Sequence, residues 1–260
     1  MAARAIWKGE LQVGGRCLPV KFYSAVEARG VHFRLLHAKD QEPVAQQMVD
    51  AETGKAVPRE EVRKGLEMED GVFVVLNPAD LAQAEPPASR TVALSSFLPA
   101  SVVPPAWFGR PYYLGPDGDE PAYFALAQAL QDSGRVGIAH WVMRKRTYDG
   151  ALISHKGALM MIALRRQEEI LALDNVSADA SAALDPKEVK LAQQLVAALE
   201  GPFEPESYHD EYRERVAKLL AAKAEGKTIP LARAKAKPAA RSLSEALQSS
   251  LKAAKENRVA

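Results

Sequence analysis

The sequence is poor in cysteine and in long apolar runs. A single cysteine, Cys17, among 260 residues excludes an internal disulfide and the multi-cysteine zinc sites, and it fits a reducing compartment. Cys17 lies in an apolar stretch, where we expect it to be buried as a small hydrophobe. No apolar run approaches the roughly 20 residues of a membrane helix, and Lys8 and Glu10 interrupt the start before a signal-peptide core could form. These absences favour a cytoplasmic protein without a membrane partner.

The motifs of common enzymes are also missing. The sequence holds no G-x-x-x-x-G-K-[ST] phosphate loop, no G-x-G-x-x-G after a strand, no G-x-S-x-G elbow and no H-E-x-x-H. The five histidines are scattered, and acidic pairs such as Glu60-Glu61 lie in polar segments that are typical of solvated surface. We therefore predict no catalytic residue, no metal, no cofactor and no enzymatic activity.

Charge is balanced over the whole chain but not along it. The totals are 34 Lys and Arg against 33 Asp and Glu, whereas residues 221–260 hold nine basic and three acidic side chains. The body is therefore slightly acidic and the tail basic. Such a tail either tethers a protein to nucleic acid or an acidic membrane, or only keeps it in solution.

Hydrophobic periodicity predicts a mixed α/β chain, rich in strands up to residue 175 and helical after it. A hairpin over residues 5–23 turns at Gly14-Gly15, and residues 40–69 form a hairpin or an exposed loop. The further strands are predicted over 31–37, 71–76, 89–98, 110–114, 136–143 and 158–164, with a polar connection over 144–157. The helices are predicted over 77–81, 121–134, 185–201 and 205–223, followed by a flexible linker over 227–241 and a last helix from Ser242.

One basic cluster stands out in the body of the chain. Arg144-Lys145-Arg146, with His155 and Lys156 across the next turn and Arg135 upstream, can converge on phosphate groups. A solvated loop is the alternative. The flanking aromatic residues, Trp141 and Tyr148, are too few for a stacking platform, so contact with a duplex backbone is the favoured interpretation.

The predicted helix over 205–223 carries an apolar stripe. Tyr208, Tyr212, Val216 and Leu219 recur at helical spacing, and they predict a face that docks a partner, with Arg213 beside it. Burial of the same stripe against the core is the alternative.

Several blocks of residues resemble the bacterial Ku proteins in a fixed order, covering about residues 4–230. They are RAIWKG at 4–9, LPVKFYSA at 18–25, F-x-x-L-H-x-x-D at 33–40, VPREEVRKGLEMEDGVFVVL at 57–76, SRT to FLP at 89–99, FGRPYYLGPD at 108–117, GRVGIA at 134–139 and YHDEYRE at 208–214.

This resemblance implies a strand-rich β-barrel core that forms a homodimeric ring on the ends of double-stranded DNA, followed by a helical C-terminal region. It implies a barrel and dimerisation core at 1–175, a helical arm of that core at 176–202, a module at 203–226 that recruits the end-joining DNA ligase/polymerase, and a basic flexible extension at 227–260.

The resemblance also implies a nucleoid-associated protein. Arg16, Arg34 and Lys39 join the candidate DNA contacts. Zinc is not expected, because residues 48–54 lack the Cys-x-x-Cys of some family members. Two other functions stay open, namely a protein-interaction scaffold that does not encircle DNA and a metal-dependent nuclease.

Overall fold

The computed structural model describes residues 4–172, 185–226, 247–248 and 250–252. The chain divides into two compact units, Met1–Ala172 and Leu173–Ala260, and each is described by itself. The predicted linker over 227–241 and the start of the predicted last helix at Ser242 lie outside the described residues, as does most of the basic extension.

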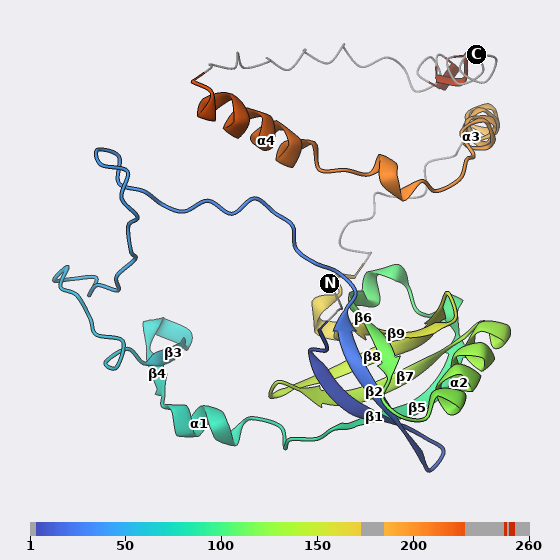
Figure 1. Ribbon diagram of the computed structural model, residues 1–260, viewed down its shortest axis with the longest axis horizontal. Helices are drawn as coiled ribbons and strands as arrows, with labels where there is room; N and C mark the ends of the chain where they lie inside the picture. The colour runs from blue at the N-terminus through green and yellow to red at the C-terminus, as the bar shows by residue number, and fades with distance from the viewer. Residues whose placement is uncertain (1–3, 173–184, 227–246, 249, 253–260) are drawn as a thin grey trace. The chain divides into compact units, whose positions relative to one another are not determined.

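Seven strands of the first unit close into a barrel, which confirms the β-barrel core (Figure 1). Around the barrel the order is β1-β2-β6-β9-β8-β7-β5, and β5 closes it by pairing with β1 in parallel. The strands are β1 (Trp7–Val13), β2 (Arg16–Ser24), β5 (Thr91–Pro99), β6 (Phe108–Pro116), β7 (Arg135–Met143), β8 (Arg146–His155) and β9 (Ala158–Leu164).

The alternation of strand residues places the core and corrects one prediction. In β2, Leu18, Val20 and Phe22 point into the barrel and are buried, as the period of two requires. Cys17 takes the opposite phase and is exposed. The prediction that Cys17 is buried is therefore wrong. Its apolar neighbour Leu18 points into the barrel, and successive residues of a strand point to opposite faces.

Trp141 is the largest fully buried side chain of the core; it is 1% exposed and stacks on Tyr148 with 5.2 Å between ring centroids. Its ring lies against the backbone of Gly150 on the neighbouring strand. A Cβ atom at Gly150 would lie 2.6 Å from the Trp141 ring and 2.9 Å from the sulfur of Met161. The absent side chain is thus what lets the indole fit inside the barrel.

Most of the segment 144–157, predicted as a polar connection, is the strand β8, so this prediction is wrong. Gly150, Ala151 and Leu152 in its middle are buried. Two-residue turns bound it, Arg144-Lys145 with φ of 50° and 65° and Lys156-Gly157 with φ of 53° and 77°. These left-handed values are those of type I′ hairpin turns. The strand was not predicted because Arg, Lys and His occupy its ends and turns, where type I′ turns usually have Asn-Gly or Asp-Gly.

Helix α2 (Glu120–Ser133) confirms the predicted helix over 121–134 and packs on the barrel. Its N-cap Asp119 accepts the backbone N–H of Ala122, and Gly134 ends it with φ 61°. The buried Tyr123 hydroxyl donates to the carbonyl of Leu114 and accepts the N–H of Leu159 at 2.8 Å. Burial raises the pKa of this phenol.

Residues 25–90, here called the insert, connect β2 to β5. The insert contains a separate two-stranded sheet, β3 (Lys64–Glu67) with β4 (Phe73–Leu76), and the helix α1 (Pro78–Gln83), which confirms the short helix predicted there and which Asn77 caps. The strand predicted over 31–37 is wrong, because only a single bridge from Leu36 to Pro43 forms there. An apolar run without a neighbouring strand to pair with gains no ladder of hydrogen bonds.

Short 3-10 helices lie between the main elements of the first unit. They are η1 (Glu69–Gly71), η2 (Ala100–Val102), η3 (Pro105–Trp107) and η4 (Gln167–Glu169). The stretch of prolines between β5 and β6 is thus built from η2 and η3, which is why it does not continue either strand.

The described part of the second unit includes the helices α3 and α4. Helix α3 (Pro186–Ala198) starts after Asp185, which caps it through the N–H of Lys187, as the Asp-Pro pair predicts. Helix α4 (Glu211–Ala224) starts after Asp210 rather than at Pro205, and η6 (Pro205–Ser207) precedes it. The predicted start is wrong because Asp210 is the N-cap: its carboxylate accepts the N–H of Arg213, so the helix begins at Glu211.

Candidate nucleic-acid interface

The strand registers define two ends of the barrel. The Arg144-Lys145 turn lies at the end where β1, β5 and β6 begin and where β2 and β9 finish. The turns at Gly14-Gly15 and Lys156-Gly157 lie at the opposite end, here called the far end. The insert leaves β2 and rejoins β5 at the first of these ends.

Topology separates the basic residues that sequence reasoning grouped together. Arg144 and Arg146 sit at one end of β8, and His155 and Lys156 at the other. Ten residues at about 3.3 Å each put some 30 Å between them. Arg135, at the start of β7, and Arg16, after the first turn, also lie at the far end. The predicted convergence of all these charges is therefore wrong.

The end with the Arg144-Lys145 turn gathers basic side chains that the sequence did not single out. We call it the basic end, and its cations are Arg90, Arg110, Arg144, Lys145, Arg146, Arg165 and Arg166. Two open hollows of about 680 and 760 Å³ flank the turn. Sequence patterns did not group four of these arginines with the others. Arg90 precedes β5, Arg110 lies near the start of β6, and Arg165 and Arg166 follow β9. Only the pairing of β5 with β7, and of β6 and β8 with β9, brings these positions to the same end of the barrel.

Some of these arginines are held in place by backbone groups. The Arg165 guanidinium donates to the carbonyl of Ala106 at 2.7 Å and also to that of Phe108. Arg110 donates to the Ser24 hydroxyl at 3.0 Å, and Arg166 to the Thr147 carbonyl at 3.5 Å. These bonds leave the positive charges uncompensated, because their acceptors are neutral.

Ion pairs divide the remaining cations into compensated and free ones. Lys145 lies 2.9 Å from the carboxylate of Glu85. Among the described residues, Arg90, Arg144 and Arg146 make no side-chain hydrogen bond or ion pair. Their exposed guanidiniums are therefore available to an anionic ligand.

Away from the basic end, Asp117 compensates two lysines. Its oxygens lie 2.9 Å from the Lys8 ammonium and 2.5 Å from that of Lys21. The hydrogen bond to Lys21, and then that to Lys8, lowers the pKa of Asp117, and the same bond to Asp117 raises the pKa of Lys21. These lysines are thus neutralised within the protein and add little to a site for phosphate.

The remaining predicted DNA contacts lie on the insert. Arg34 and Lys39 are exposed there, outside any strand. The turns nearby are held by carboxylates, since Asp40 bonds His37 at 2.8 Å and Asp50 accepts the N–H of Thr53 at 2.7 Å. Within the described part of the chain, no three His, Cys, Asp or Glu residues come together as a metal site.

The predicted partner-binding residues fall on both sides of the start of α4. Tyr208 precedes the helix, and its ring lies 5.3 Å from that of Phe203. Tyr212, Arg213 and Leu219 are exposed on α4, whereas Val216 is buried. One of its four apolar side chains is thus covered, and the others are exposed. No helix in the described ranges is long and apolar enough to span a membrane.

Comparison with known proteins gives the family. The Ku70/Ku80 beta-barrel domain matches residues 13–191. Curated relatives include non-homologous end joining protein Ku 2 of Geotalea uraniireducens (strain Rf4), 35% identical over 97% of this chain and 99% of the relative. The protein Ku of Koribacter versatilis (strain Ellin345) is 35% identical over 98% and 88%, and that of Anaeromyxobacter sp. (strain K) 38% identical over 97% and 86%.

The family model spans the insert, most of the barrel and the start of α3, and the relatives are matched over nearly the whole chain. They confirm the resemblance seen in the sequence, and with it the prediction of a non-enzymatic protein, against the alternative of a nuclease. The chain belongs to the Ku family.

Proposed function

We propose that this protein binds the ends of double-stranded DNA as a homodimeric ring in non-homologous end joining, and that it recruits the end-joining DNA ligase/polymerase. The relatives named for non-homologous end joining support the process. One observation supports the ring most directly. The insert leaves the barrel and returns to it at the basic end, so the basic side chains and the insert lie at the same end. This role would place the protein on the nucleoid.

The basic end suits a duplex without regard to sequence. Arginines bind phosphate oxygens through paired N–H groups, and such contacts position a protein on DNA without reading its bases. Free guanidiniums on Arg90, Arg144 and Arg146 provide such contacts. The far-end candidates Arg16, Arg135, His155 and Lys156 cannot reach the same stretch of backbone, so we assign the main contacts to the basic end.

The insert supplies the surface for a second copy. Many of its large apolar side chains are exposed, among them Phe33, Leu35, Leu36, Met48, Val49, Leu66, Met68, Val72, Phe73, Val74 and Val75. A two-stranded sheet with both faces open is marginal by itself, and so large an apolar surface is typical of an interface. A symmetric contact between two inserts would bury these side chains and close a ring over the two basic ends.

Substitution in β4 tests this interface. Val75 is 62% exposed, and Val75→Glu would place two carboxylates in a symmetric apolar contact, so we expect the dimer to dissociate roughly 100-fold more readily. Sedimentation equilibrium measures this. Val196→Glu makes the same change on α3, where the side chain is 73% exposed, and should leave the dimer intact. A monomeric wild-type protein, or a Val75→Glu protein that dimerises normally, would contradict the interface.

The second unit is the proposed ligase contact. Tyr208 and Tyr212 remain exposed although Val216 is buried, which supports docking over complete burial of the stripe. A chain that ends at Gly201 should bind DNA like the full protein and lose its stimulation of the ligase in a strand-joining assay. Full stimulation by the shortened chain would refute docking through this segment, and unfolding of the shortened chain would show instead that the helix is part of the core.

A further inference from the structure

The smaller hollow at the basic end has the composition of a binding site. It has a volume of about 680 Å³ and lies between the end of the insert and the barrel. Its lining comes from residues between 82 and 90, from the start of β1 and from the end of β7 with the turn that follows. Two strand ends and a connecting segment thus meet around one open space.

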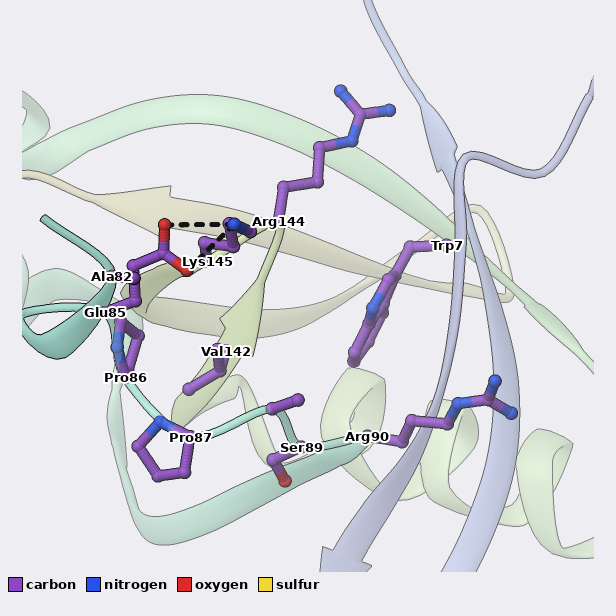
Figure 2. Close-up of a pocket in the computed structure, with 11 residues that line it drawn as sticks. Trp7, Ala82, Glu85, Pro86, Pro87, Ser89, Arg90, Val142, Arg144 and Lys145 are labelled. Carbon is purple, nitrogen blue, oxygen red and sulfur yellow. Dashed lines mark hydrogen bonds and ion pairs between the residues drawn. The ribbon is translucent and has the colours of Figure 1, made fainter. Parts of the chain in front are cut away.

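An indole ring forms one wall of this hollow. Figure 2 shows the Trp7 ring on one side of the space, with Val142, Pro86 and Pro87 across from it. Phe22 packs against this ring in an edge contact, with 4.9 Å between the ring centroids. Gly9 has no side chain that would displace it, because a Cβ there would collide with the Trp7 ring. An aromatic surface opposite an aliphatic one accepts a flat ring.

Positive charge surrounds this wall. The lining holds three cationic side chains, Arg90, Arg144 and Lys145, against one carboxylate, Glu85. Lys145 is paired with Glu85 at 2.9 Å, as the dashed lines in Figure 2 show. The charges left over are the two arginines, which reach away from the ring in different directions (Figure 2). The hollow therefore suits a flat ring with an anionic group on either side.

We infer that this hollow binds a nucleotide of a single-stranded extension at the DNA end, with its base on Trp7 and its phosphates at Arg90 and Arg144. The inference rests on the proposed DNA-binding function and deepens it. A base-paired duplex cannot offer the face of an internal base, whereas an unpaired terminal nucleotide offers both a face and adjacent phosphates. The arginine pair favours a repeating phosphate chain over a peptide.

The test compares the same short duplex with blunt ends and with a short thymidine extension, using the full-length protein. We expect the extended duplex to bind at least about fivefold more tightly, the gain from stacking one base on an aromatic ring. Trp7→Leu and Arg144→Gln should each remove this ratio. Arg144 is exposed and unpaired among the described residues, so its substitution does not disturb the core. Arg135→Gln, the same change at the far end, should preserve the ratio.

The outcomes separate the hollow from the general function. Equal binding of blunt and extended duplexes, with normal affinity for the blunt one, would overturn the hollow alone. A protein that binds no duplex at all would overturn the proposed function. Binding of a 5′-phosphorylated oligothymidylate would then test the hollow by itself. Binding that depends on Trp7 would support the inference, and no binding would refute it. A Glu-Tyr-Glu peptide that competes where the oligonucleotide does not would also refute it.

Discussion

A linear duplex will retain this protein at a salt concentration that removes it from a covalently closed circle of the same sequence. A groove lined with arginine attaches anywhere on DNA, since all phosphates are equivalent. Salt weakens these contacts through counterion release. A closed ring is also held by encirclement, and it can enter only from a free end.

The order of blocking the DNA ends makes this prediction stricter. Bulky groups placed on both ends before the protein is added should abolish the salt-resistant complex, and the same groups placed afterwards should trap it. Retention can be measured by pull-down of the DNA after a high-salt wash. Equal retention on circular and linear DNA would leave a basic scaffold that does not encircle DNA, the alternative that the sequence kept open.

Much of the fold could be predicted because its signals are local. The Gly14-Gly15 turn, the helix start at Pro121 and the Asp185-Pro186 start each specify an element boundary through backbone chemistry, and each prediction is confirmed. The errors arise where tertiary contacts decide. β8 depends on pairing with β7 and β9, and residues 31–37 have the composition of a strand without a partner.

The site was harder to predict than the fold because proximity in sequence was taken for proximity in space. Arg146 and His155 are nine positions apart and stand at opposite ends of one strand, whereas Arg90 and Arg144 line the same hollow. Only the register of β5 on β7 brings that pair together. Trp7 was seen as a strand residue, and nothing in its sequence neighbourhood indicated that its ring faces a hollow.

Reversing the charge of Arg90, Arg144 and Arg146 should weaken duplex binding roughly 500-fold at about 0.1 M salt, because three lost phosphate contacts each remove about 0.9 from the slope of log K against log salt. The slope itself should become shallower by about 2.7. These three side chains are exposed and have no ion-pair partner among the described residues, so the barrel should fold normally.

The matched control reverses Arg16, Arg135 and Lys156, which carry the same total charge at the far end. Net charge changes equally in both triple variants, so a general electrostatic effect would weaken both alike. Contact through the basic end predicts a large loss of affinity in the first variant and a small one, with a nearly unchanged salt slope, in the second. Fluorescence anisotropy titrations of a labelled duplex at several salt concentrations give both quantities. Equal losses would refute the assignment of the DNA to the basic end, and a larger loss in the control would move the duplex to the far end of the barrel, away from the insert that the ring requires.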